Sequence, residues 1–267
     1  MSERQIIVTI ANNVATLTLN RPKRGNSLTP QMNDEILEVL PKLAADPEVR
    51  VLVLTGAGKY FCTGMDLSGG GGLDPETVKQ GFAKGLLVFD AFYRFPKPVI
   101  ARVNGPCYGG GVGLVFTTDI RVATKDVFFA LTEVKRGIIP AIISQYIVPE
   151  VGPQKAKEYM LTGRKVYMDE ATFMNKKVNT VDELDNAVKE YVDSLVDSAP
   201  GAMANIKRLV DGVYHGASKE RLENIKQHVE GAYLEMMQSD ESVFGISAFL
   251  SKEKPDWNQF LKDKAKL

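Results

Sequence analysis

Two continuous apolar runs, each ending in glycine, constrain the fold of this chain most strongly. They are VRVLVLTG at residues 49–56 and PVIARVNG at residues 98–105, and an apolar helical pattern opened by Asp74-Pro75 lies between them. Continuous apolar strands are typical of a sheet that is covered on both faces. Because a strand, a helix and a parallel strand are joined by a right-handed crossover, the sequence predicts an α/β core with a parallel sheet.

The segments around these two strands add a hairpin and a long helical tail. The opening IIVTIANNVATLTLN alternates about an Asn-Asn turn and predicts strands near residues 5–11 and 14–20. Thr29-Pro30 supplies an N-cap and a first-turn proline for an amphipathic helix. Strand signals nearly vanish after about residue 142, and helical periodicity dominates from residue 182 onward. The expected fold class is therefore α/β with a helical C-terminal region.

Composition and charge exclude several classes of protein. Lys plus Arg and Asp plus Glu number 33 each, without a block of like charge, so neither nucleic acid nor a membrane surface is an expected partner. Without a membrane-length apolar run or an N-terminal signal core, we expect a soluble protein that is not secreted. The two cysteines, Cys62 and Cys107, lack CxxC spacing, which predicts reduced thiols and no zinc site. The only histidines, His215 and His228, fall in late helical segments, which makes imidazole catalysis an unfavoured hypothesis.

A glycine-rich stretch, NGPCYGGGVGL at residues 104–114, follows the second buried strand and opens a helix. Glycine costs a helix roughly 1 kcal/mol relative to alanine, so we expect its backbone to approach another group closely. Ligands of open α/β sheets bind beyond the carboxyl ends of the strands, and a second loop, YFCTGMD at residues 60–66, follows the first buried strand. Both loops can offer uncovered backbone amides, and the glycine-rich one adds the positive end of a helix dipole. Together they suit an anionic oxygen.

The spacing of the glycines narrows the kind of anion. The stretch matches neither a phosphate-binding loop nor a dinucleotide fingerprint, and GxSxG occurs nowhere in the chain. What remains is a pair of amides that bind an oxygen whose negative charge develops during a reaction. Tight packing of the helix against the strand is the alternative explanation for these glycines.

An oxyanion site needs a group that moves protons, and Glu133 is the leading candidate. It follows the apolar strand FFAL and precedes a turn that ends in proline. Apolar surroundings raise the pKa of a carboxylate into the range that is useful for acid and base catalysis. An ion pair with Lys135 or Arg136 is the alternative role for Glu133. Other aspartates are expected to be turn, cap or ion-pair residues: Asp66, Asp119 and Asp126.

Four motifs, in order and spacing, resemble the enoyl-CoA hydratase/isomerase (crotonase) family. They are LNRPKRGNSL at residues 19–28, YFCTGMDL at 60–67, VIARVNGPCYGGGVGL with TDIRVAT at 99–124, and EVKRGIIP at 133–140. The likeness runs from about residue 6 to 258. It implies a crotonase (ClpP-like) α/β spiral of ββα units over residues 1–199 and a C-terminal helical trimerisation region over residues 200–267. It also implies an acyl-CoA substrate, no cofactor beyond the coenzyme A of that substrate, no metal, and a homotrimer or dimer of trimers.

The resemblance assigns roles to individual residues. The amides of Met65 and Gly110 would donate to the thioester oxygen, and Glu133 falls on the second catalytic glutamate of the family. Further positions match residues that bind the substrate or CoA: Lys23, Arg24, Cys62, Gly64, Asp66, Leu67, Gly109, Phe249 and Lys252. A solvated role is the alternative for the two basic residues at the start of that set.

The chain departs from the family pattern at Gly113, where hydratases with two acids carry a glutamate. The function we expect first is hydration of a 2-enoyl-CoA, with Glu133 as general acid and base. One alternative is Δ3,Δ2-enoyl-CoA isomerisation by the same single glutamate, and another is a non-catalytic CoA-ester-binding or scaffolding trimer. The segment EVKRGIIPAIISQYIV is similar to a branch that includes 3-methylglutaconyl-CoA hydratase-like bacterial members and fungal peroxisomal members.

The chain stops at Ala265-Lys266-Leu267, a conservative variant of the Ser-Lys-Leu address that the peroxisomal import receptor reads. A random basic tail is the alternative explanation. We expect a peroxisomal protein if the source is eukaryotic and a cytoplasmic one otherwise. None of the motifs specifies the length or branching of the acyl chain.

Overall fold

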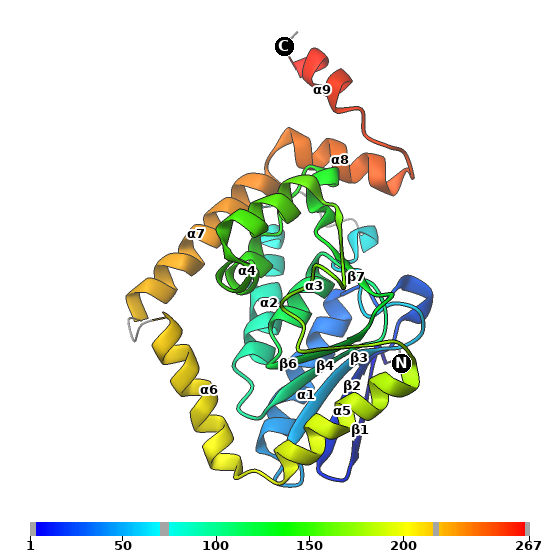
Figure 1. The fold of residues 1–267 in the computed structure, drawn as a ribbon. Coiled ribbons are helices and arrows are strands. Elements are labelled where there is room, and N and C mark those ends of the chain that lie inside the picture. The colour runs from blue at the N-terminus through cyan, green and yellow to red at the C-terminus, as the bar shows by residue number, and fades with distance from the viewer. Residues whose placement is uncertain (1–3, 70–74, 216–218, 265–267) are drawn as a thin grey trace.

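The computed structural model describes residues 4–69, 75–215 and 219–264 (Figure 1). Its larger sheet has six strands in the order β1-β2-β3-β4-β6-β9. Their bounds are Ile6–Ala11 (β1), Val14–Leu19 (β2), Val51–Gly56 (β3), Val99–Val103 (β4), Ile120–Thr124 (β6) and Lys176–Val178 (β9). The β1–β2 pair is antiparallel and every other pair in this sheet is parallel. The predicted α/β core with a parallel sheet is confirmed.

The N-terminal hairpin has the turn that its sequence predicts. Asn12 and Asn13 connect β1 to β2 with φ angles of 51° and 64°. Two left-handed residues in a row are the geometry of a two-residue type I′ turn, which asparagine tolerates. The pairing of Ala11 with Val14 continues this turn directly into the ladder.

Helices cover both faces of the larger sheet (Figure 1). The main core packs α1 to α4 against one face, and a smaller apolar cluster packs α5 against the other. All six residues of β3 are buried, as its continuous apolar run predicts. The predicted N-cap is confirmed, because the Thr29 side chain accepts a hydrogen bond from the Met32 amide. The helices are Pro30–Ala45 (α1), Pro75–Tyr93 (α2), Gly110–Phe116 (α3), Ala141–Thr162 (α4) and Val181–Val196 (α5).

A second, three-stranded sheet carries the chain to Glu133. It has the order β5-β7-β8, with bounds Cys107–Tyr108 (β5), Phe128–Ala130 (β7) and Lys165–Tyr167 (β8). The short 3₁₀ helix η3, Thr132–Arg136, follows β7 directly and contains Glu133. Two further 3₁₀ helices are η1, Pro22–Arg24, and η2, Leu67–Gly69. Strands β8 and β9 were not predicted from the sequence. Each has three residues, which is too short for an alternating pattern to be recognised.

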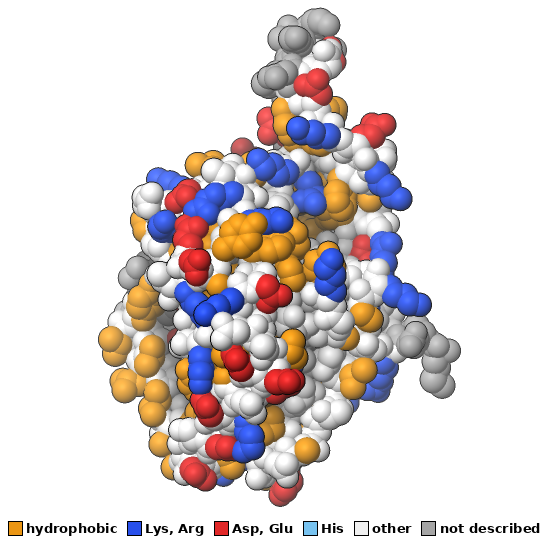
Figure 2. Space-filling view, turned by 45° about the vertical axis from the view of Figure 1, so that its right-hand side comes forward, with side chains coloured by type: hydrophobic (Ala, Val, Ile, Leu, Met, Phe, Trp, Pro, Cys, Tyr) orange, Lys and Arg blue, Asp and Glu red, His pale blue; other side chains and the backbone are white. Residues whose placement is uncertain are grey.

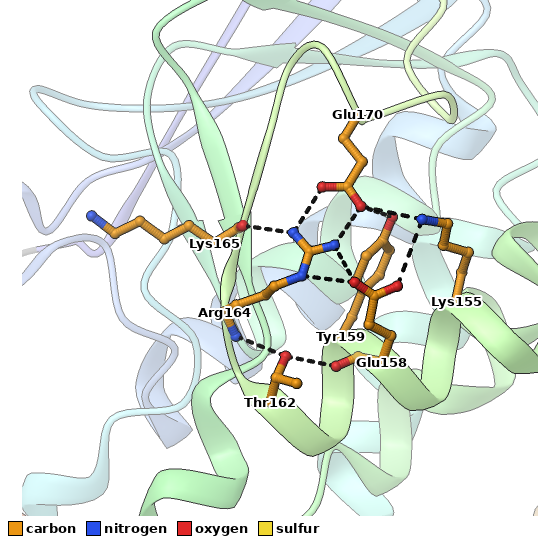
Figure 3. Close-up of polar contacts among 7 residues, drawn as sticks. All are labelled: Lys155, Glu158, Tyr159, Thr162, Arg164, Lys165 and Glu170. Carbon is orange, nitrogen blue, oxygen red and sulfur yellow. Dashed lines mark hydrogen bonds and ion pairs between the residues drawn. The ribbon is translucent and has the colours of Figure 1, made fainter.

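A charged network fixes the end of α4 beside this second sheet (Figure 3). The Arg164 guanidinium donates to Glu158 Oε1 at 2.9 Å and to Glu170 Oε2 at 2.7 Å. At the end of the helix, a Cβ atom on Gly163 would lie 3.1 Å from the carbonyl oxygen of Leu131, the residue that precedes η3. Arg164 also donates to the carbonyl of Lys165 in β8, which pairs with Ala130 of β7, the strand that leads to Glu133.

The C-terminal helices lie along the edge of the core and above it (Figure 1). They are Pro200–His215 (α6), Lys219–Met237 (α7), Asp240–Leu250 (α8) and Trp257–Lys264 (α9). Helix α7 packs against α2 and α4 through a third apolar cluster. Helix α6 instead exposes apolar residues, and Figure 2 shows hydrophobic side chains gathered along the left-hand edge, where α6 lies. No helix of the described residues is long and apolar enough to cross a membrane.

Candidate active site

A cavity of about 710 Å³ opens where the two predicted loops meet. Residues of both loops line it, together with residues of α1, α2, η3, α4, α7 and α8. The basic residues Lys23 and Arg24 lie at one part of its lining, and a set of apolar side chains from α2, α4 and α7 forms another. The cavity therefore combines a charged part with an apolar part, as ligand sites commonly do.

Backbone pairing holds the two loops side by side. The amide of Tyr108 donates to the carbonyl of Cys62 at 3.0 Å, and Cys62 and Cys107 form an isolated parallel bridge. A second bridge pairs Leu28 with Met65. In the Leu28–Met65 bridge the Gly64 carbonyl accepts from the Leu28 amide and the Asp66 amide donates to the Leu28 carbonyl, so the Met65 amide takes no part in it.

The amides of Met65 and Gly110 are the free donors of this arrangement. Within the described residues neither amide donates to a backbone carbonyl outside regular secondary structure, and Gly110 is the first residue of α3, where helix amides lack an intrahelical acceptor. A Cβ atom on Gly64 would lie 3.0 Å from the Gly110 nitrogen. Gly64 has a φ of +87° and Gly109 a φ of +48°, which favour glycine. Close approach of the backbones therefore explains the glycines, as the sequence predicts.

The carboxyl group of Glu133 lies beside Gly109, the residue that precedes Gly110. Its Oε1 would be 3.0 Å from a Cβ atom on Gly109, and its Oε2 is buried without a hydrogen-bond partner among the described residues. Burial raises the pKa of Glu133 to about 7, against smaller lowering effects of its own backbone amide and of Arg136. No ion pair joins Glu133 to Lys135 or Arg136 in the described part of the chain, so the alternative role as an ion-pair partner is not observed.

Hydrocarbon fills the space beside Gly113, the position at which the sequence departs from the two-acid pattern. A Cβ atom on Gly113 would lie 2.1 Å from Ile143 Cγ2 and 3.0 Å from Phe89 Cε1. Gly113 and Ile143 are both buried. Because neither neighbour can hold a water molecule by a hydrogen bond, this wall of the cavity is apolar.

Asp66 anchors the loop that carries Met65. Although partial burial alone would raise its pKa, hydrogen bonds from Ser68 and Arg21 lower it to about 2. Arg21 Nη2 lies 2.9 Å from Asp66 Oδ2. Asp119 likewise accepts from the amide of Val99 and pairs with Lys207. These two aspartates are ion-pair residues, as predicted, and the exposed Asp126 lies in the turn between β6 and β7, also as predicted.

The structure places most of the other predicted binding residues in the cavity lining. Those that line it are Lys23, Arg24, Gly64, Asp66, Leu67, Gly109 and Phe249. Cys62 does not, because its side chain is fully buried and its sulfur accepts from the Gly64 amide. Lys252 lies just beyond the end of α8, exposed and outside the lining. Both cysteines are free, as expected, and no group of three His, Cys, Asp or Glu side chains in the described ranges could hold a metal ion.

Arg136 and Asn33 are polar lining residues to which the sequence assigns no binding role. Arg136 stacks over the ring of Phe249, with 4.3 Å between guanidinium carbon and ring centroid, and donates to Thr132. Asn33 lines the cavity from α1, and its Oδ1 is buried without a partner among the described residues. Arg136 follows Glu133 by one 3₁₀ turn, a spacing that could have indicated it. Asn33 was not indicated by the sequence, because a polar residue next to the apolar stripe of a helix is normally solvent-facing.

An α/β core with two loops that meet beside a buried acid is typical of an enzyme. Comparison with known proteins identifies the family. The chain belongs to the enoyl-CoA hydratase/isomerase family, whose model matches residues 9–261. The enoyl-CoA hydratase ACTT6 of Alternaria alternata is 35% identical over 91% of this chain and 80% of its own length. The carnitinyl-CoA dehydratase of Escherichia coli (strain K12) is 33% identical over 96% of this chain and 99% of its own.

Solved structures agree with this assignment. An enoyl-CoA hydratase/isomerase from Xanthobacter autotrophicus Py2 superposes with a TM-score of 0.84 at 28% identity, covering 94% of this chain and 96% of the other. An enoyl-CoA hydratase from Mycobacterium avium superposes with a TM-score of 0.83 at 29% identity, covering 96% and 100%. The crotonase fold predicted from the motifs is confirmed. The chain is an enzyme of the enoyl-CoA hydratase/isomerase family, with which an acyl-CoA substrate is consistent.

Proposed function

We propose that this enzyme adds water across the double bond of a 2-enoyl-CoA through a thioester enolate. The observation that carries the proposal is the position of Glu133, a buried carboxyl with a pKa of about 7 beside the glycines of the oxyanion loop. A carboxyl with that pKa can accept and return a proton near neutral pH.

The amides of Met65 and Gly110 would donate hydrogen bonds to the thioester oxygen. This oxygen gains negative charge as the enolate forms, so the two donors stabilise the transition state more than the substrate. Removal of one such donor costs about 3 to 4 kcal/mol in other enzymes. Helix α3 has only seven residues, but the positive end of its dipole lies at Gly110, where the oxygen would bind.

Glu133 would move the protons in two steps. The carboxylate takes a proton from water while the water oxygen bonds to carbon 3, and the electron pair of the double bond passes into the enolate. The protonated carboxyl then gives this proton to carbon 2, which restores the thioester carbonyl. No further reactant is needed, and coenzyme A takes part only as a portion of the substrate.

A second candidate function is Δ3,Δ2-enoyl-CoA isomerisation, and the apolar wall at Gly113 favours it. Isomerisation needs no bound water, because Glu133 alone can remove a proton from carbon 2 and return it to carbon 4. Gly113 has no side chain, and its neighbours Ile143 and Phe89 offer no polar group that could help to hold a water molecule.

Assays with crotonyl-CoA and with 3-hexenoyl-CoA separate these functions. Hydration of crotonyl-CoA to the 3-hydroxyacyl thioester supports the first proposal. Turnover of 3-hexenoyl-CoA to the 2-enoyl isomer without any hydration supports the second and contradicts the first. Binding of acyl-CoA esters by calorimetry, without turnover of either substrate, points to the non-catalytic CoA-ester-binding alternative.

The exposed apolar face of α6 supports the proposal of a homotrimer or a dimer of trimers. Ile206, Leu209 and Val213 are 57%, 64% and 77% exposed, an unusual concentration for the surface of one helix. We propose that residues 200–267 form the assembly region. Analytical ultracentrifugation tests this, because a Leu209→Lys, Val213→Lys double variant should dissociate to smaller species, and a monomeric wild-type protein would contradict it.

The proposed peroxisomal location depends on Ala265-Lys266-Leu267, which lies outside the described residues. A fusion of a fluorescent protein to the last ten residues should enter peroxisomes in a eukaryotic cell. The same fusion without Leu267 should stay in the cytosol. Cytosolic fluorescence of both fusions would contradict the proposal.

A further inference from the structure

Helix α2 presents a row of three residues to the cavity, two of them glycines. Gly81, Gly85 and Phe89 are spaced four residues apart, so they share one face of the helix, and all three line the cavity. Glycine is the least favourable residue for a helix interior apart from proline. Two glycines on this one face therefore call for an explanation.

The first glycine adjoins open space, and the second adjoins a flexible side chain. A Cβ atom on Gly81 would have no atom within 4 Å, and a Cβ atom on Gly85 would meet only Ile142 Cδ1, at 2.9 Å. Side chains at these positions would project into the cavity. The glycines therefore leave free a groove that most residues would fill.

The groove begins at the oxyanion donors. Phe89 Cζ lies 3.6 Å from the position of a Cβ atom on Gly110, the residue whose amide is one of the proposed donors. From Phe89 to Gly81 the helix rises about 12 Å, at 1.5 Å per residue. With carbon–carbon bonds of about 1.5 Å in a zigzag, this is the length of a chain of roughly nine carbons.

A second part of the lining, contributed by α7, is largely apolar. Tyr233, Met236 and Met237 of α7 line it, and Tyr233 packs against Phe82 of α2 with 4.8 Å between ring centroids. Methionine side chains are flexible and fit chains of varied shape. We call the space between Gly81, Gly85, Ile142, Tyr233 and Met236 the acyl groove.

We propose that the acyl groove binds long, unbranched, apolar acyl chains and makes this enzyme selective for long-chain acyl-CoA thioesters. The inference rests on the proposed function for the position of the thioester. Each methylene group buried in an apolar site favours binding by roughly fourfold, which corresponds to about 0.8 kcal/mol. Selectivity should therefore rise steadily with chain length until the groove is filled.

The first test compares crotonyl-CoA, 2-octenoyl-CoA and 2-dodecenoyl-CoA as substrates of the wild-type enzyme. We expect kcat/KM to rise by at least about 100-fold from crotonyl-CoA to dodecenoyl-CoA. A kcat/KM that is flat or falls with chain length overturns the inference, although the proposed reaction would stand.

The second test fills the groove. Gly81→Leu should lower the ratio of kcat/KM for dodecenoyl-CoA to that for crotonyl-CoA by at least about tenfold. The matched control is Gly231→Leu on α7, an exposed helical glycine that also has open space beside it and does not line the cavity. The control should keep the wild-type ratio, and an equal ratio in both variants contradicts the inference.

A binding measurement keeps the inference testable if no enoyl-CoA is turned over. Calorimetry with the saturated esters butyryl-CoA and lauroyl-CoA should show tighter binding of lauroyl-CoA to the wild-type protein, and Gly81→Leu should remove most of that difference. Equal affinity of the two esters for the wild-type protein rejects the acyl groove, whatever the reaction is.

Discussion

The walls on the two sides of the glycine-rich loop, residues 104–114, have opposite chemistry. On one side η3 places the buried carboxyl of Glu133 beside Gly109. On the other side Ile143 and Phe89 occupy the space beside Gly113, on the same helix as the proposed donor Gly110. At Gly113 the carboxylate is absent, and apolar side chains also occupy the space that it would need. Because hydrocarbon occupies the space, the proposed reaction assigns all of the proton transfer to Glu133.

Substitution of Glu133 should have the largest effect on the rate. We expect Glu133→Gln to lower kcat by at least about 100-fold, because the amide cannot accept or return a proton. Calorimetry should show that acyl-CoA still binds. The control is Glu38→Gln, which removes an exposed carboxylate that forms a surface ion pair with Lys42 and should change kcat little. Unchanged turnover of Glu133→Gln would contradict the proposed role of Glu133 as acid and base.

The apolar wall can be tested by adding the missing acid. Gly113→Glu should lower the free energy of unfolding by about 3 kcal/mol or more, since its Cβ would overlap Ile143 at 2.1 Å. Ile143→Ala should provide room, so the double variant should be more stable than Gly113→Glu alone in urea denaturation. If Gly113→Glu alone is as stable as the wild type, the space beside Gly113 is not filled as described.

The ionisation of Glu133 should also make the free energy of unfolding depend on pH. The folded-state pKa of Glu133 is raised from 4.5 to about 7, so folding favours its protonated form. The wild type should therefore lose stability as the pH rises through this window, up to about 3 kcal/mol above about pH 8. Glu133→Gln does not ionise and should be the more stable protein at about pH 8, with this advantage gone near pH 4. Thermal unfolding at both pH values measures it, and a wild type that equals the variant at pH 8 contradicts a raised pKa.

A smaller effect is expected where the donor loop is anchored. Asp66→Asn should cost about 1 to 2 kcal/mol of unfolding free energy, because Arg21 and Ser68 lose a charged acceptor. A modest fall in kcat should accompany it through displacement of the Met65 amide. Asp193→Asn, which affects only an exposed pair with Lys189, is the control. A kcat loss as large as that of Glu133→Gln would mean that Asp66 acts directly in the reaction.

Periodicity and glycine spacing were sufficient to predict the strands of the larger sheet except β9, the first helices and the meeting of the two loops. Continuous apolar strands and the left-handed Asn12-Asn13 turn are local properties that a sequence records directly. The filled wall was not predictable, because Ile143 lies on α4 and reaches Gly113 only through tertiary packing. The same is true of Asn33, whose orientation depends on how α1 meets its neighbours.

Exchange of the α-protons of butyryl-CoA in deuterated water tests the central claim most directly. This saturated thioester cannot be hydrated or isomerised, so exchange at carbon 2 reports only enolate formation between the two amides and the acid. The account predicts that the wild-type enzyme catalyses this exchange, that the rate rises with pH through about 7 as Glu133 ionises, and that Glu133→Gln abolishes it. Absence of exchange in the wild type, or the same rate in the variant, would contradict the account.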